Sequence, residues 1–228
     1  MKEELLDKLA KTIVDGDEQA AGKVAGEILS AGMNPVEAIK QGATKGLDEI
    51  GEKYQRLEAF LPELIRAGEA MKACLAVFMP HIKPEEEGGI KLGRMVIGTV
   101  AGDIHDIGKS IVATMLTVTG FEVYDLGINV SVKRFVEKAA EVEAKIIGLS
   151  ALLTQSSYYQ HEVIKYLKDT GLRKKYYVVI GGAAVTPEWA TEIGADGYGK
   201  MAPHACQLVK RLVTGGMPPP LPEPIIIQ

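Results

Sequence analysis

Apolar residues recur along the first part of the chain, up to about residue 83, at the three- and four-residue spacing of amphipathic helices. The recurring positions are Leu5, Leu6, Leu9 and Ile13, then Val24, Ile28 and Leu29, then Ile39, Leu47 and Ile50, and then Leu61, Leu64, Ile65 and Met71. Turn-forming residues separate these groups at 15–17, 32–35 and 60–62, where the prolines suit a first helical turn. The pattern predicts an N-terminal all-α bundle of four helices.

From Ile90 onward the pattern changes to short apolar runs that alternate with amphipathic helical stretches. Strands are expected at residues 95–100, 122–125, 146–149 and 176–180, and around Gly197-Tyr198. Alternating βα units of this length predict an α/β domain with a doubly wound parallel sheet covered on both faces. Five strands favour the flavodoxin-like (Rossmann-like) version of this fold.

Two composition changes predict the domain boundaries. Pro84-Glu85-Glu86-Glu87-Gly88-Gly89 has the charge and glycine content of an exposed hinge, which gives a helical domain over 1–87 and an α/β domain over 88–215. The tail, 216–228, carries five prolines, so it is expected to be extended and to have no core of its own. Its last apolar run, 225–227, could dock a partner or remain disordered.

Composition excludes several classes of protein. The 228 residues are 46% hydrophobic and 25% charged with a net charge of -4, which is ordinary for a water-soluble chain and gives no excess of positive charge for nucleic acid. No apolar run approaches membrane-spanning length and the start lacks a secretory apolar core, so we expect a cytoplasmic protein. Cys74 and Cys206 lie far apart, which suggests neither a disulfide nor a zinc site.

Candidate chemistry lies in the loop 102–110, where a predicted strand gives way to a helix at the ligand-binding edge of such sheets. Asp103 stands two residues before His105, so one ring nitrogen of the histidine can donate to the carboxylate while the other points outward as a ligand. The loop ends in Gly-Lys-Ser like a phosphate-binding P-loop, but five residues separate Gly102 and Gly108, whereas that motif requires four. A simple loop histidine is the other alternative.

Two further strand ends carry polar or small residues on the same edge. Ser150, Leu152, Thr154 and Ser156 follow the third strand, and 181–183 (Gly-Gly-Ala) follow the fourth. Paired glycines let a ligand approach the backbone closely. Together the three loops predict a pocket for a large ligand that has a coordinating metal and a nucleotide-like tail, although each hydroxyl taken alone could be a helix cap.

The spacing of these loops resembles the DxHxxG…SxL…GG signature of cobalamin-binding domains. Residues 103–108 are followed after 41 residues (109–149) by Ser150-Ala151-Leu152, and after 28 more (153–180) by Gly181-Gly182. The helical part, with Phe60-Leu61-Pro62-Glu63-Leu64 and Ala67-Gly68-Glu69-Ala70-Met71-Lys72, looks like the cap domain of methionine synthase and of small corrinoid proteins. The resemblance covers nearly the whole chain except the tail, without catalytic barrels, and therefore indicates a free-standing corrinoid subunit of a methyltransferase system.

The resemblance implies a cobalamin cofactor, as methylcobalamin or a related corrinoid, bound base-off/His-on. His105 matches the lower axial cobalt ligand, and Asp103 and Ser156 match the hydrogen-bonded relay behind it. The remaining implied cofactor contacts are Ile104, Asp106, Gly108, Ser150, Leu152, Thr154, Gly181, Gly182, Ala183, Tyr198 and Ala202, with Phe60 and Leu64 from the cap. A bulky side chain at Gly182 is expected to weaken cobalamin binding and leave the sheet intact.

Several residues have a competing structural explanation. Phe60, Leu64 and Met71 fall near one helical face and could lie over the upper side of the corrin, but apolar helix residues usually form the bundle interior. His81, His161 and His204 have no carboxylate two residues upstream, so we treat them as surface or structural residues.

The implied function is a corrinoid methyl carrier of one-carbon metabolism, which is not expected to turn over alone. A substrate-specific methyltransferase would supply the methyl group, an acceptor methyltransferase would pass it to a folate or a thiol, and a reductive activase would restore the cofactor. The methyl donor, whether methylamine, methanol, glycine betaine or a methoxylated aromatic, cannot be read from the chain. A non-enzymatic cobalamin sensor, a cobalamin-dependent isomerase subunit and a cofactor-free α/β protein are the alternatives.

Overall fold

The computed structural model describes residues 2–82 and 92–228, which form two compact units. One unit contains the chain up to Leu92 together with Thr117–Gly120, and the other contains Gly93–Leu116 and Phe121–Gln228. The expected hinge at 84–89, and the boundary between 87 and 88 within it, lie outside the described residues. Each unit is therefore considered by itself.

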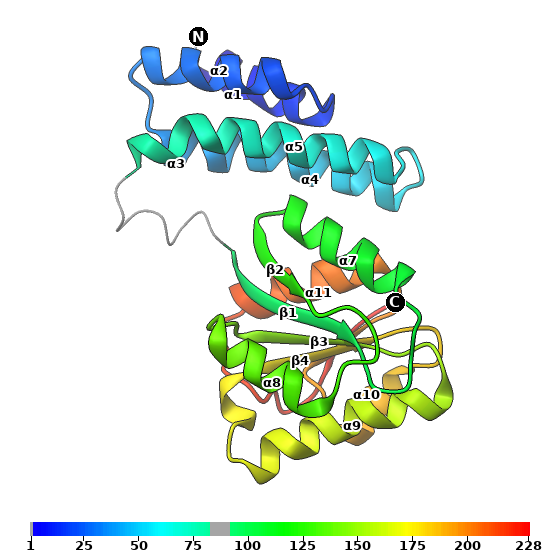
Figure 1. The fold of residues 1–228 in the computed structure, drawn as a ribbon. Coiled ribbons are helices and arrows are strands. Elements are labelled where there is room, and N and C mark those ends of the chain that lie inside the picture. Colours follow the sequence, from blue (N-terminus) through cyan, green and yellow to red (C-terminus); the bar gives the residue numbers. More distant parts are fainter. Residues whose placement is uncertain (1, 83–91) are drawn as a thin grey trace. The chain divides into compact units, whose positions relative to one another are not determined.

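The helical unit contains the four predicted helices (Figure 1). They are α1 (Lys2–Val14), α2 (Glu18–Ser30), a continuous stretch made of α3 (Pro35–Ala38), η1 (Ile39–Ala43) and α4 (Thr44–Gln55), and α5 (Leu61–Phe78), which is followed by the short 3-10 turn η2 (Met79–His81). The side chains of Asp17 and Asn34 cap α2 and α3 by accepting backbone N–H groups. Most of the apolar stripe predicted from the sequence lies inside, and Leu9, Ile28 and Leu47 are at most 3% exposed. Ile65 is an exception, because it is 41% exposed.

Glycine allows close packing within this bundle. A Cβ atom added at Gly46 would lie 2.4 Å from the backbone oxygen of Ala10, so a larger residue would push α1 and α4 apart. The single cysteine of α5, Cys74, is fully buried, and burial raises the pKa of its thiol to about 12. It behaves as a small apolar residue, as expected.

The second unit is built on a parallel sheet with the strand order β2-β1-β3-β4-β5-β6. The strands are β1 (Gly93–Thr99), β2 (Phe121–Asp125), β3 (Ile146–Ser150), β4 (Tyr177–Gly181), β5 (Gly197–Gly199) and β6 (Ile225–Ile227). The first five match the predicted strands to within two residues, and their order is that of a flavodoxin-like fold.

The predicted count of five strands is wrong, because the end of the tail forms a sixth. Ile225 donates from its backbone N–H to the oxygen of Asp196 (3.0 Å), and Lys200 donates to the oxygen of Ile227 (3.1 Å). The proline-rich stretch before β6 is held by the buried carboxylate of Asp196, which accepts the N–H of Leu221 at 2.7 Å. The tail is therefore part of the sheet rather than an appendage.

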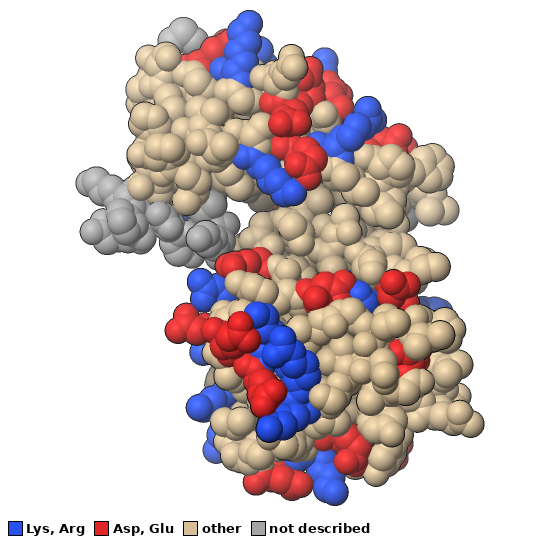
Figure 2. Space-filling view, viewed as in Figure 1, with Lys and Arg blue, Asp and Glu red and all other residues tan. Residues whose placement is uncertain are grey.

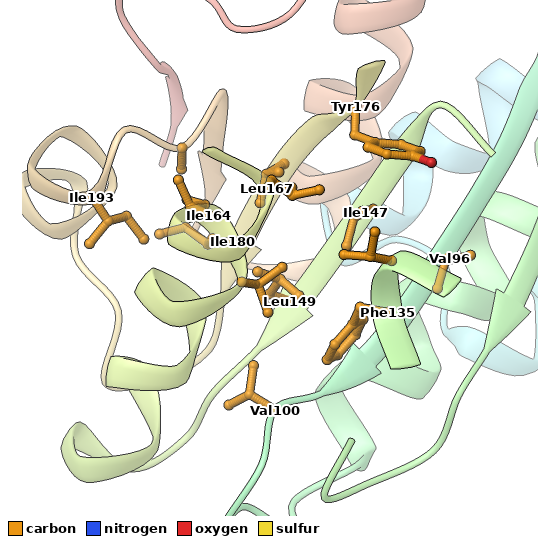
Figure 3. Close-up of a cluster of buried hydrophobic side chains, with 14 of the residues drawn as sticks. Val96, Val100, Phe135, Ile147, Leu149, Ile164, Leu167, Tyr176, Ile180 and Ile193 are labelled. Atoms are coloured by element: carbon orange, nitrogen blue, oxygen red, sulfur yellow. The ribbon is translucent and has the colours of Figure 1, made fainter. Parts of the chain in front are cut away.

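Helices cover both faces of the sheet (Figure 1). On one face lie α8 (Val132–Glu141), α9 (Thr154–Asp169) and α10 (Pro187–Ile193), and on the other lie α7 (Ile107–Val118) and α11 (Ala202–Thr214); the turn η3 (Arg173–Lys175) precedes β4. Thr186 caps α10 through its hydroxyl, as the sequence predicts. Figure 3 shows the core on the first face, where Phe135 of α8 and Ile164 and Leu167 of α9 pack against Ile147 and Leu149 of β3.

Basic and acidic side chains are interspersed over the face of the molecule shown in Figure 2. None of the helices in the described part of the chain is long and apolar enough to cross a membrane.

Candidate functional site

The loop between β1 and α7 carries His105 at the carboxyl end of the sheet. Its Nδ1 lies 2.7 Å from Oδ1 of Asp103, and its side chain is 46% exposed. Since an ionised carboxylate can only accept, the proton of this pair is on Nδ1. The opposite ring nitrogen, Nε2, has no hydrogen bond to any described residue and is a free ligand atom.

Asp103 is fully buried but extensively hydrogen-bonded. Oδ1 also accepts the backbone N–H of His105 at 3.0 Å, and Oδ2 accepts the N–H groups of Leu152 and Leu153 at 2.8 and 3.3 Å and the hydroxyl of Ser156 at 2.5 Å. Burial raises the pKa of this carboxyl, but the bonds from Ser156, His105 and Leu152 outweigh it and hold the pKa well below its usual range. The carboxylate is thus a fixed negative charge behind His105.

Two residues that the sequence reading did not select fix the backbone of this loop. The hydroxyl of Thr99 donates to the oxygen of His105 at 2.8 Å. The side-chain oxygen of Asn129 accepts the N–H of Gly102 at 2.8 Å, and the backbone N–H of Asn129 donates to the backbone oxygen of Asp103 at 2.9 Å. Asn129 has a φ of 51°, in the left-handed region that asparagine tolerates. A Gly-x-Asn turn after a strand is the sequence signal that could have identified it.

Lys109 is a third residue that was not selected from the sequence. It is only 3% exposed although it carries a charge, and its Nζ forms an ion pair with Asp125 at the end of β2. The other oxygen of Asp125 accepts the N–H of Gly127 at 2.9 Å. This pair fastens the first turn of α7 to the neighbouring strand, which is a structural reason for the Gly-Lys-Ser ending of the loop.

The predicted hydroxyl and glycine residues are brought to the same edge. Ser150 ends β3 directly beside Gly181, which ends β4, and Thr154 begins α9. Thr154 and Ala183 are exposed, Ser150 and Gly181 are half-buried, and Leu152 is 39% exposed. Ile104, Asp106 and Gly108 are also exposed along the His105 loop. These residues line one continuous edge.

The expectation for Gly182 requires a correction. A Cβ atom there would lie 1.9 Å from the backbone oxygen of Ala151, and the residue has a φ of +121°. The protein's own backbone therefore demands glycine at this position, so a bulky side chain would disturb the two strand ends. Gly181 is less constrained, since the atom nearest to its added Cβ is the oxygen of Gly199 at 3.1 Å.

The remaining predicted residues differ in exposure. Tyr198 is 5% exposed in β5, and Ala202, half-buried, begins α11. In the helical unit Phe60 is 65% exposed, whereas Leu64 and Met71 are only 2% and 6% exposed. Of these three cap residues, only Phe60 presents its side chain to solvent.

Comparisons with known proteins match both units. Two family models, each described as a B12 binding domain, match residues 93–206 and 5–78. Over 209 residues the chain is 44% identical to trimethylamine corrinoid protein 1 of Methanosarcina mazei, covering 92% of this chain and 97% of the relative. The chain belongs to the corrinoid proteins of methyltransferase systems.

Other relatives agree with this assignment. This corrinoid protein is 44% identical over 212 residues to the dimethylamine corrinoid protein of Methanosarcina barkeri, covering 93% and 99% of the two chains. It is similar in structure to a cobalamin-binding protein from Desulfitobacterium hafniense, with a TM-score of 0.71, 35% identity and coverage of 90% and 97%. It is also similar to a chain of the methanol:cobalamin methyltransferase complex of M. barkeri, with a TM-score of 0.78, 25% identity and coverage of 94% and 81%.

Three features of the corrinoid protein's site fit a corrinoid cofactor. His105 offers an accessible nitrogen ligand with a carboxylate behind it. An added Cβ at Gly108 would meet nothing within 4 Å, so the space beside the loop is open. Finally, Nδ1 of His204, in the first turn of α11, is buried and has no hydrogen-bond partner among the described residues, which leaves hydrogen-bonding capacity for a bound group.

Proposed function

We propose that this corrinoid protein is a methyl carrier. It takes a methyl group from a methylated amine held by a substrate-specific methyltransferase and passes it to an acceptor, a folate or a thiol, held by a second methyltransferase. The names of the trimethylamine and dimethylamine relatives support an amine donor, and the methanol:cobalamin methyltransferase complex supports work with a partner. When bound, the cobalt of the corrinoid supplies the chemistry of accepting and donating the methyl group.

The observation that carries this proposal is the free Nε2 of His105 with its Nδ1 proton held by Asp103. In our proposal Nε2 would hold the cobalt in place of the cofactor's own base, which is the base-off/His-on form. Asp103 orients the ring and makes it a better electron donor, and the hydroxyl of Ser156 stabilises that carboxylate at 2.5 Å. Methylcobalamin or a related corrinoid is the proposed resident form.

Other residues on the edge would bind the rest of the cofactor. We assign the hydroxyls of Ser150 and Thr154, together with the strand end at Gly181 and Ala183, to the displaced nucleotide tail. Tyr198 and Ala202 would form the far wall of its slot. We also propose the exposed residues Ile104, Asp106, Gly108 and Leu152 as contacts of the corrin, and Phe60 as the exposed residue of the helical unit that would contact the cofactor.

Partners complete the proposed cycle. The carrier would not turn over alone, because in this proposal the amine is held by the substrate-specific methyltransferase. A reductive activase would restore the cofactor after accidental oxidation. We propose that a boundary between the cap and cofactor domains at residues 87 and 88 would let the cofactor be shielded and then uncovered.

Electron paramagnetic resonance tests the ligand assignment. Protein grown with heavy-nitrogen histidine and loaded with ordinary cobalamin should, in the Co(II) form, show doublet splitting from the axial nitrogen instead of the triplet given by ordinary nitrogen. His105→Ala should remove this protein-derived splitting, whereas the same substitution at the half-buried His161 should not. A triplet that persists in the labelled protein would show that the cofactor's own base is bound, and the assignment would fail.

A further inference from the structure

A buried amide on α9 connects the ends of β3 and β4. Gln160 is 0% exposed, and its Nε2 donates to the backbone oxygens of Leu149 at 3.0 Å and of Gly181 at 3.2 Å. Its Oε1 accepts the indole N–H of Trp189 at 3.1 Å. Because carbonyls only accept and the indole only donates, these partners fix the orientation of the amide.

The two carbonyls belong to the strand ends that carry the proposed nucleotide slot. Gly181 pairs in register with Ser150, and its oxygen also accepts the N–H of Ala151 at 3.1 Å. Trp189 lies in α10, which follows the loop after β4. Gln160 therefore bridges β3, β4 and α10 at the carboxyl edge of the sheet.

The same helix carries the hydroxyl behind the axial histidine. Ser156 stands four residues before Gln160, so both side chains lie on one face of α9, and Ser156 is only 3% exposed. Ser156 reaches Oδ2 of Asp103 at 2.5 Å, and the other oxygen of Asp103 holds Nδ1 of His105. A shift of α9 along the sheet would move this hydroxyl directly, because the helix is a rigid rod.

We infer that Gln160 is a positioning residue that sets the strength of the His105 ligand through Ser156 and Asp103. Its bonds to Leu149 and Gly181 hold the first turns of α9 in register with the sheet, and Trp189 holds the amide in place. The inference rests on the proposed function, since it concerns the ligand of that site. Nothing in the DxHxxG…SxL…GG pattern includes Gln160 or Trp189.

The first test needs no cofactor. Nuclear magnetic resonance of the histidine ring nitrogens in the apoprotein reports which nitrogen of His105 carries the proton. In the parent protein the proton should be on Nδ1, and Gln160→Met, which keeps the volume but removes the amide, should give a mixture of both forms. Trp189→Phe removes the indole N–H and should shift the ratio of the two proton positions in the same direction, but by less. This variant provides the test if Gln160→Met does not fold.

The second test uses the protein loaded with cobalamin in the Co(II) form. In protein labelled with heavy-nitrogen histidine, the doublet-split fraction of the signal should fall in Gln160→Met. The equilibrium between ligated and unligated His105 should change by roughly fivefold to tenfold, which is the size expected if the variant costs the single hydrogen bond between Ser156 and Asp103. In a Ser156→Ala background, Gln160→Met should cause no further change. An additive effect in the double variant would show that Gln160 does not act through Ser156.

Arg173→Met is the matched control. Arg173 is also a buried side chain that donates to two backbone carbonyls, those of Tyr176 at 2.9 Å and Gly194 at 2.8 Å, but it lies at the opposite end of β4. It also pairs with the buried Asp196 at 2.9 Å, so its replacement should cost at least as much stability as that of Gln160. Arg173→Met should lower the stability of the protein without changing the proton position or the ligation of His105. The inference would be overturned if Arg173→Met changed the proton position and ligation of His105 as much as Gln160→Met does. It would also be overturned if both Gln160→Met and Trp189→Phe left the proton position and ligation of His105 unchanged. Failure of the parent protein to bind cobalamin would instead count against the proposed function, while the apoprotein test would still apply.

Discussion

At the scale of single residues, Asp103 shows how a buried charge is retained. An isolated carboxylate in the interior of a protein is very costly, but here five donors surround the two oxygens. The same donors orient the carboxylate toward His105. Local structure and proposed chemistry therefore depend on one set of bonds.

Replacing this carboxylate should destabilise the apoprotein. In Asp103→Asn one oxygen becomes an NH₂ group, which must face another donor, either at Leu152 and Ser156 or at His105. We expect a loss of about 2 kcal/mol in the free energy of unfolding, measured with urea. His105→Ala, at a half-exposed position, should cost less than half of that. An unchanged midpoint for Asp103→Asn would contradict the hydrogen-bond arrangement.

Glycines 181 and 182 should differ sharply although they are neighbours. Gly182→Ala places a Cβ 1.9 Å from the oxygen of Ala151 at a φ of +121°, so we expect a loss of about 2–3 kcal/mol in unfolding free energy. Gly181→Ala meets its nearest atom at 3.1 Å, without a positive φ, and should cost much less. Urea unfolding of both variants measures the difference, and equal losses would be inconsistent with the close approach of Gly182 to Ala151.

At the scale of secondary-structure elements, β6 joins a sheet through a single buried carboxylate and a few backbone bonds. Asp196 accepts the N–H of Val178 at 2.6 Å and the N–H of Leu221 at 2.7 Å, and it pairs with Arg173 at 2.9 Å. It thus connects β4 to the tail. The proline-rich segment can follow an extended path because its ends are held in this way.

Hydrogen exchange measured residue by residue should reveal this attachment. The amides of Leu221 and Ile225 donate to Asp196 and should exchange slowly. The amide of Ile226 should exchange faster, because alternation along a parallel strand turns it away from β5. Asp196→Asn should accelerate exchange at Leu221 first. Uniformly fast exchange across the tail would show that β6 is not formed in solution.

At the scale of the whole molecule, the chain carries a cofactor-binding unit and a helical unit, both matched by B12 binding family models. In the proposed role, His105 and the carboxyl edge of the sheet would hold the corrinoid, and the partner methyltransferases would hold the methyl donor and the acceptor. The selectivity for the methyl donor would thus lie in the partner rather than in this chain.

Partner dependence can be tested directly by absorption spectroscopy. The reduced, corrinoid-loaded protein mixed with a methylated amine alone should show no change in its corrinoid spectrum. Addition of a methylamine-specific methyltransferase should produce the spectrum of the methylated cofactor, and His105→Ala should lower the yield. Equal conversion without the partner would exclude a carrier role, and failure with every methylamine partner would exclude the amine as donor.

The local pattern of the sequence determined most of the fold. Apolar residues at helical spacing specify the helices of the first unit, and the first five strands fall within two residues of their predicted bounds. These predictions succeed because the spacing of apolar residues shows which face of a helix or strand is buried. The sequence also identified Asp103, His105 and Ser156 as candidate site residues. They match positions of a known family, whose motif specifies the spacing between strand ends that lie far apart in the chain.

Only the tertiary structure decided the rest, because those features depend on residues far apart in the chain. Residues Ile225–Ile227 form a strand because β5 offers an edge for pairing and the carboxylate of Asp196 accepts the N–H of Leu221. Neither contact can be predicted from the local sequence of the tail. Gly182 must be glycine because the backbone of Ala151 lies against it. Gln160 and Asn129 look like ordinary polar residues in sequence, and their roles arise from carbonyl and N–H groups that folding brings within hydrogen-bonding distance.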